Sequence, residues 1–147
     1  MTLPRKPPLV HDWDLANWEK RTGKCRVCGA EDRKIELAHV VGVRCDTREA
    51  VEEERLFRGK VQPVRVAYIN PDRVVPLCGP QVNTGTCHYR LDLGHDLELW
   101  DHLTDREKRQ AVKDAGSLGQ ALHRLAPLTW ENRLEFNANG DLIEVAV

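Results

Sequence analysis

The chain has 147 residues, a formal net charge of −1, 41% hydrophobic residues and 31% charged residues. This composition excludes a disordered chain and predicts one domain with a modest core. The near-neutral charge excludes a strongly basic nucleic-acid coat protein, although a local basic patch can still exist.

The first half of the chain predicts a short helix followed by two strands. Residues 1–8 lack the apolar core of a signal peptide, and apolar runs elsewhere are too short to span a membrane, so we expect a cytoplasmic protein without a membrane partner. Residues 11–23 predict a helix, because an aspartate can cap its start and a glycine its end. Residues 35–41 and 61–69 predict strands, and the charged segment 46–60 between them is expected to be an insertion.

The second half is predicted to be mainly helical. An apolar, strand-like run over residues 74–77 precedes a helix expected over residues 87–94. A capping-box pattern opens a helix over residues 104–115, and residues 117–125 predict another. We expect this helix pair to pack against the rest of the protein rather than to act as a helix-turn-helix. Residues 134–145 predict a β-hairpin around an Asn-Gly turn, which could add a strand or form a homodimer contact.

Four of the five cysteines are predicted to form one structural zinc site. A Cys-x-x-Cys turn brings the thiolates of Cys25 and Cys28 together, and Cys78 and Cys87 supply two more ligands across a flexible loop. In a cytosolic chain, paired cysteines favour a metal site over disulfides. The alternative is that Cys78 and Cys87 are ordinary buried thiols. Cys45 has no partner at knuckle spacing and is expected to be a free thiol.

A second metal site is suggested by one histidine and one aspartate. His88 directly follows Cys87, and Asp92 lies four residues later on the same helical face. An imidazole and a carboxylate at this spacing can hold one divalent ion. Basic residues crowd around the first cysteine pair and form either a nucleic-acid patch or ordinary solvated surface. They are Lys20, Arg21, Lys24, Arg26, Arg33 and Lys34.

Taken in order, these motifs resemble the HNH endonuclease family, in particular its phage-borne members with a zinc knuckle. The resemblance covers residues 25–95. The motifs that carry it are Cys25-x-x-Cys28, Leu37-Ala38-His39-Val40, Arg73-Val74-Val75-Pro76-Leu77-Cys78 and Cys87-His88-x-x-x-Asp92. It implies a single α+β domain over residues 1–147, with a ββα-metal core in that segment. Accessory helices and the hairpin would follow over residues 96–147.

The resemblance implies a metal-dependent endonuclease that hydrolyses DNA phosphodiester bonds. His39 would be the general base that takes a proton from the attacking water. His88, with Asp92, would hold a catalytic magnesium or manganese ion, or another divalent ion, which stabilises charge on the phosphate and the leaving oxygen. The structural zinc would hold the ends of the core together. The partner would be DNA in the cytoplasm, the host cytoplasm if the protein is phage-encoded.

The sequence departs from the family pattern at two positions. Arg73 stands where the family has an asparagine that fixes the loop orienting the base, and Asn70 lies three residues earlier. Either residue could serve there, so both join His39 as candidate catalytic-site residues, and an arginine could instead contact phosphate. Ala38 stands where many members have a metal-binding acid or histidine, and Glu36 is the nearest acid before it.

Two other functions stay open. A zinc-stabilised nucleic-acid-binding module without catalysis would account for the basic residues and for Ala38 and Arg73. A zinc-stapled protein-interaction domain would account for the near-zero net charge and for the accessory segment outside the motifs.

Overall fold

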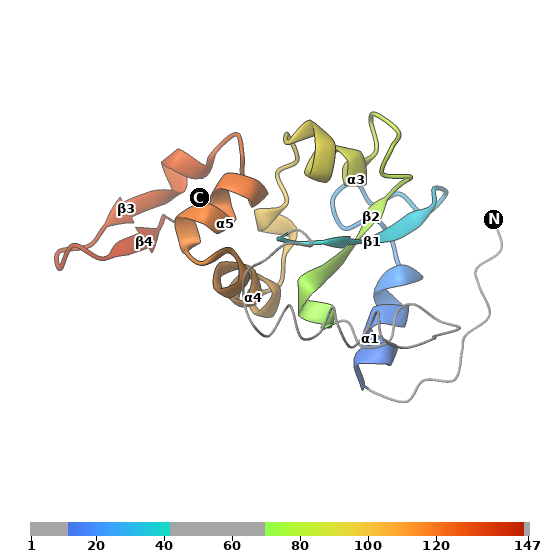
Figure 1. Ribbon diagram of the computed structural model, residues 1–147, viewed down its shortest axis with the longest axis horizontal. Helices are drawn as coiled ribbons and strands as arrows, with labels where there is room; N and C mark the ends of the chain where they lie inside the picture. Colours follow the sequence, from blue (N-terminus) through green and yellow to red (C-terminus); the bar gives the residue numbers. More distant parts are fainter. Residues whose placement is uncertain (1–11, 42–69, 146–147) are drawn as a thin grey trace.

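The computed structural model describes residues 12–41 and 70–145; the expectations for Cys45, for the insertion 46–60 and for the strand 61–69 lie outside these ranges. Helices and two small sheets make up the described part, which confirms the α+β class (Figure 1). The elements up to residue 94 are α1 (Asp12–Arg21), β1 (Ile35–His39), η1 (Pro71–Arg73), β2 (Val74–Cys78), α3 (Cys87–Tyr89) and η2 (Arg90–Gly94). Those that follow are η3 (Trp100–His102), α4 (Asp105–Ala115), α5 (Leu118–Leu125), η4 (Trp130–Arg133), β3 (Leu134–Phe136) and β4 (Leu142–Glu144).

Strands β1 and β2 pair antiparallel and form the centre of the fold. Their register places Ile35 opposite Cys78 at one end and His39 opposite Val74 at the other. Every residue of β2 is buried, as expected for its apolar sequence. In Figure 1 α3 lies above the two strands and α1 lies below them, and both helices contact β2. The two ends of this sheet therefore carry different chemistry, with cysteine ligands at one end and His39 at the other.

One hydrophobic core extends from the sheet to the helices that follow it. Leu91, Leu97, Leu99 and Trp100 join the buried side chains of β2 to those of α5. The indole of Trp100 is almost fully buried, and its Nε1–H donates a hydrogen bond to the Glu144 carboxylate on β4. The accessory segment therefore packs against the core. No helix within the described ranges combines the length and the apolar character needed to cross a membrane.

The capping box predicted for the second half of the chain is confirmed. Thr104 and Glu107 form the reciprocal capping box of α4, and Gly116 ends that helix with φ of 95°. The Ser117 side chain caps α5. Strands β3 and β4 form the expected hairpin, and Gly140 occupies its turn with φ of 82°.

Glu107 connects three parts of the chain through one buried carboxylate. Its side chain is 1% exposed and accepts hydrogen bonds from Lys20 Nζ of α1 at 2.6 Å and from Arg26 Nη1 at 2.7 Å. The same ammonium of Lys20 donates to the Val74 carbonyl at 2.9 Å and to the Pro71 carbonyl. Burial opposes ionisation of Glu107, but the bonds from Arg26 and Lys20 outweigh it and lower its pKa. Ionised Glu107 thus holds α1, the first cysteine turn and α4 together.

We expect Glu107→Gln to lower the free energy of unfolding by about 2–4 kcal/mol, because it leaves two partly buried cations without their carboxylate. The pKa of Glu107 is lower in the folded state than in the unfolded state. Its contribution is therefore complete above the unfolded-state pKa and is lost as the pH falls through the folded-state value. Urea unfolding of the native protein and the variant between neutral and acidic pH measures both effects.

Glu31→Gln is the matched control, since the Glu31 pair with Lys24 is about two-thirds exposed at both residues. Its loss should cost less than about 1 kcal/mol. Equal losses in the two variants would contradict the role given to Glu107.

Candidate metal centre and polar site

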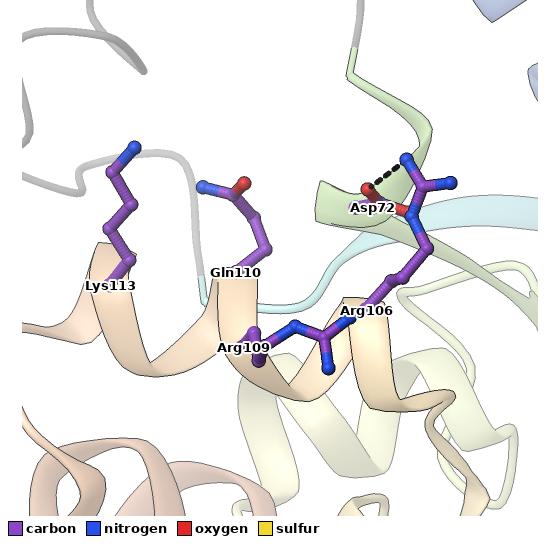
Figure 2. A pocket seen from close by; sticks show the side chains of 5 residues that line it. All are labelled: Asp72, Arg106, Arg109, Gln110 and Lys113. Atoms are coloured by element: carbon purple, nitrogen blue, oxygen red, sulfur yellow. Dashed lines mark ion pairs between the residues drawn. The ribbon is translucent and has the colours of Figure 1, made fainter.

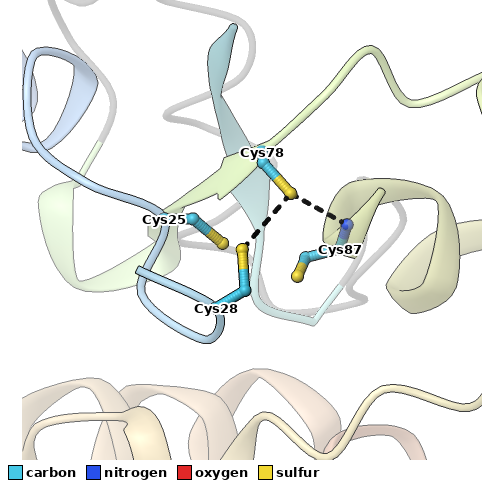
Figure 3. A group of neighbouring side chains, drawn as sticks. All are labelled: Cys25, Cys28, Cys78 and Cys87. Carbon is cyan, nitrogen blue, oxygen red and sulfur yellow. Dashed lines mark hydrogen bonds between the residues drawn. The ribbon is translucent and has the colours of Figure 1, made fainter. Parts of the chain in front are cut away.

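The sulfur atoms of four cysteines converge on one point, as the sequence predicts. The sulfurs of Cys25, Cys28, Cys78 and Cys87 all lie within 4.8 Å of one another (Figure 3). The Cys28 and Cys78 sulfurs are 3.7 Å apart. Four thiolates around a zinc ion, each about 2.3 Å from the metal, would be separated by about 3.8 Å. This group of four thiols can therefore hold a metal ion such as zinc.

Local hydrogen bonds position the first two cysteines. The Gly29 N–H donates to the Cys25 carbonyl at 2.9 Å, and Gly29 has φ of 73°, which closes the turn tightly. The Arg26 N–H donates to the Pro76 carbonyl of β2 at 2.9 Å. The turn is thus joined to the strand that ends in Cys78.

The second pair of cysteines is positioned by the sheet and by a helix cap. Cys78 is the last residue of β2, and its sulfur accepts a hydrogen bond from the Cys87 N–H at 3.2 Å. The Thr86 hydroxyl caps α3, so that helix begins at Cys87. Cys78 and Cys87 are buried beside Cys25 and Cys28. The alternative that Cys78 and Cys87 are ordinary buried thiols, unrelated to the first pair, is therefore wrong.

The ionisation of the thiols also favours a cation at this centre. Burial and the neighbouring Cys25 thiol raise the pKa of Cys87 well above its ordinary value. Burial opposes ionisation of Cys25 as well, but backbone N–H groups lower its pKa to about 7. A positive ion at this centre would lower the cost of holding several thiolates together.

We expect the purified protein to contain one zinc ion per chain, and Cys87→Ser to lose it. Because a structural metal contributes directly to folding, that variant should melt roughly 10 °C or more below the native protein. Cys45→Ser is the control and should keep both the zinc and the melting temperature. Elemental analysis with thermal melts tests this, and a full zinc content in Cys87→Ser would contradict the ligand set.

A second group of polar side chains surrounds His88 at the start of α3. His88 Nδ1 lies 2.9 Å from Glu36 Oε1, and His88 Nε2 lies 3.1 Å from Asp92 Oδ2. Asp92 also accepts hydrogen bonds from Gln81 Nε2 at 2.6 Å and from Arg124 Nη2 at 2.9 Å. We call these five residues the His88 cluster. The structure thus brings together His88 and Asp92 as predicted and adds three residues to them.

The charges of the His88 cluster balance one another. Burial opposes protonation of His88, but hydrogen bonds to Asp92 and Glu36 raise its pKa above the ordinary histidine value. Burial likewise opposes ionisation of Asp92, while His88, Arg124 and Gln81 together hold its pKa well below its usual range. The pKa of Glu36 is lowered too, against the effect of its burial, mainly by His88. Two carboxylates therefore flank one imidazole, with Arg124 as a fixed positive charge.

His39 lies at the end of β1 and is connected to this cluster through Arg124. The Arg124 guanidinium donates to the His39 carbonyl at 3.0 Å and to the Val40 carbonyl at 2.7 Å, while it pairs with Asp92. The His39 side chain is half-buried. One arginine from α5 thus fixes the end of β1 relative to the helix that carries Asp92.

Asn70 and Arg73 are both buried in the segment that leads into β2. The Asn70 side chain caps η1 by accepting a hydrogen bond from the Asp72 N–H at 3.0 Å. Arg73 makes a two-point ion pair with Asp114 of α4, at 2.9 Å and 3.1 Å. The Arg73 carbonyl accepts from the Val40 N–H. These contacts fix the loop beside His39, and the buried guanidinium of Arg73 is engaged by Asp114 rather than directed at solvent.

The sequence reasoning did not assign Glu36, Gln81 or Arg124 to the site. Glu36 had a usable signal, because strand alternation places it on the same face of β1 as Ala38. Gln81 and Arg124 lie in no motif, and only the folded chain brings them to Asp92.

No protein-family model, curated protein or solved structure matches this chain.

Proposed function

We propose that this protein is a metal-dependent DNA endonuclease of the HNH type. The observation that carries the proposal is the arrangement of the His88 cluster. A short helix that begins at a cysteine ligand presents His88 and Asp92 beside a two-stranded antiparallel sheet whose first strand ends in His39. This order of strand, strand and helix is what a ββα-metal core requires.

Zinc would be a structural ion bound by the four cysteines. Four sulfur donors form a closed tetrahedral set without a position for substrate, which is typical of structural rather than catalytic zinc. Because Cys87 and His88 are adjacent, zinc binding would fix the position from which the imidazole extends.

The His88 cluster fits a second, harder divalent ion. An imidazole nitrogen and carboxylate oxygens are donors that manganese and magnesium accept. Glu36 would replace the acid that is missing at Ala38, because it lies on the same face of β1 and already contacts His88. Such an ion, when bound, neutralises negative charge on the scissile phosphate and the leaving oxygen. An ion bound at a His88 ring nitrogen would take the place of the proton that this nitrogen carries in the imidazolium form.

His39 would act as the general base. It would take a proton from the water that attacks the phosphorus, and the P–O bond to the leaving oxygen would then break. Pairing of β1 with β2 and the hydrogen bond from Arg124 to the His39 carbonyl fix the backbone that carries this imidazole.

A zinc-stabilised nucleic-acid-binding module without catalysis is the second candidate. The observation that favours it is the ion pair between Arg124 and Asp92, which places a fixed cation on one of the carboxylates that a divalent ion would need. Salt-sensitive DNA binding without metal-dependent cutting would select this function.

We expect His39→Ala to reduce plasmid nicking in manganese or magnesium by about 100-fold or more, because the general base is lost while both ion sites remain. His102→Ala is the control, since His102 is exposed and lies outside the site, and it should nick at the native rate. Equal nicking by native protein and His39→Ala would remove His39 as the base. Absence of metal-dependent nicking by the native protein on linear, supercoiled and branched DNA would favour the binding module.

A further inference from the structure

A basic face on α4 lies outside the site described above. It borders an open hollow of about 210 Å³ that is lined by Asp72, Arg106, Arg109, Gln110 and Lys113. Figure 2 shows Arg106, Gln110 and Lys113 extending from one side of the helix, with Asp72 beside Arg106. Among these described lining residues, three are cations and one is a carboxylate. We call these five residues the α4 basic face.

The spacing of these residues produces a line of charge along the helix. Arg106, Arg109 and Lys113 are three and four residues apart, so they follow one another along one side of α4. From Arg106 to Lys113 the helix rises by about 10 Å, a length over which one strand of duplex DNA carries about three phosphates. Lys108 lies on another side of the helix, with its ammonium 5.3 Å from the centre of the Trp100 ring.

The opposing carboxylate is weakly held. Arg106 Nη2 lies 3.3 Å from Asp72 Oδ2, but the Arg106 side chain is 74% exposed. An ion pair of this exposure contributes little and is readily exchanged for another anion. A phosphate could therefore replace Asp72 as the partner of Arg106.

The α4 basic face lies at the His39 end of the sheet. The buried Arg73–Asp114 ion pair fixes α4 to η1, and η1 leads directly into Val74, the partner of His39 in the sheet register. The cysteine centre lies at the opposite end, where Ile35 pairs with Cys78. A phosphate backbone bound along α4 would therefore lie beside η1, at the end of the sheet that carries His39.

We propose that the α4 basic face binds the phosphate backbone of duplex DNA and so holds the duplex beside the end of the sheet that carries His39. The choice of DNA rests on the proposed function, whereas the line of cations is a property of the structure itself. The contact is with phosphates, so it contributes affinity without sequence preference.

The test is equilibrium binding of a fluorescent 20-base-pair duplex to zinc-loaded protein, measured by anisotropy across a salt series. We expect the triple variant Arg106→Gln/Arg109→Gln/Lys113→Gln to bind on the order of 100-fold more weakly at 0.1 M salt. In a plot of the logarithm of the affinity against the logarithm of the salt concentration, its slope should be shallower by up to about 2.7. Asp72→Asn should tighten binding, because it removes the one carboxylate of the face. Melting temperatures near the native value would show that the variants are folded.

The control is Arg21→Gln/Lys24→Gln/Arg33→Gln, which removes the same charge from exposed residues near the first cysteine pair. Equal weakening by both triple variants would show that DNA binding does not prefer α4 to the basic residues near the first cysteine pair, and would overturn the inference. Unchanged affinity and slope in the α4 variant would overturn it too, as would a native protein that binds no duplex at low salt.

The two proposals can fail separately. If DNA binding depends on the α4 cations but the protein does not nick DNA, the DNA-binding role of α4 stands and the nuclease proposal is wrong. If nicking depends on His39 but the affinity for DNA is unchanged in the α4 variant, the nuclease proposal stands and the DNA-binding role of α4 is wrong.

Discussion

The convergence of four cysteine sulfurs is the constraint on which the rest of the structure depends. It joins the turn at Cys25, the end of β2 and the start of α3, which come from separate parts of the chain. Since Cys87 is followed directly by His88, the same centre determines where the imidazole lies relative to Glu36. A metal ion there would stabilise a region that is rich in loops and short elements, and such a region gains little from its own packing.

Buried ion pairs extend this constraint into the accessory segment. Glu107 and Asp114 fix α4 to α1 and to η1, and Arg124 fixes α5 to the end of β1 and to Asp92. Each pair joins residues far apart in the sequence, and each has a partner in or beside the two-stranded sheet. The segment after residue 95 therefore completes the polar site, with Arg124 as its contribution to the charge balance of the His88 cluster.

The sequence could predict what depends on local spacing. The Cys-x-x-Cys turn, the pairing of His88 with Asp92, the capping box of α4 and the Asn-Gly hairpin each follow from neighbours a few residues apart. Arg124 was missed for a physical reason, because its partner is set by tertiary packing: Arg124 and Asp92 are 32 residues apart.

Arg73 is a residue that the sequence did single out, but whose partner it could not predict. Its motif position suggested a contact with phosphate, but its guanidinium pairs with Asp114, 41 residues later, and no local pattern marks that partner. The sequence gives the type and charge of a residue. The role of a charged side chain depends on which oppositely charged side chain lies beside it in the folded protein.

Two separate sets of residues would divide the two ions, with the four cysteines holding a structural ion and the His88 cluster holding the reactive one. Manganese binding to zinc-loaded protein, followed by electron paramagnetic resonance, tests this directly in the native protein and in His88→Ala. We expect one bound manganese per native chain, loss of that site in His88→Ala and an unchanged zinc content in both. Loss of zinc from His88→Ala, or manganese binding that does not depend on His88, would contradict it.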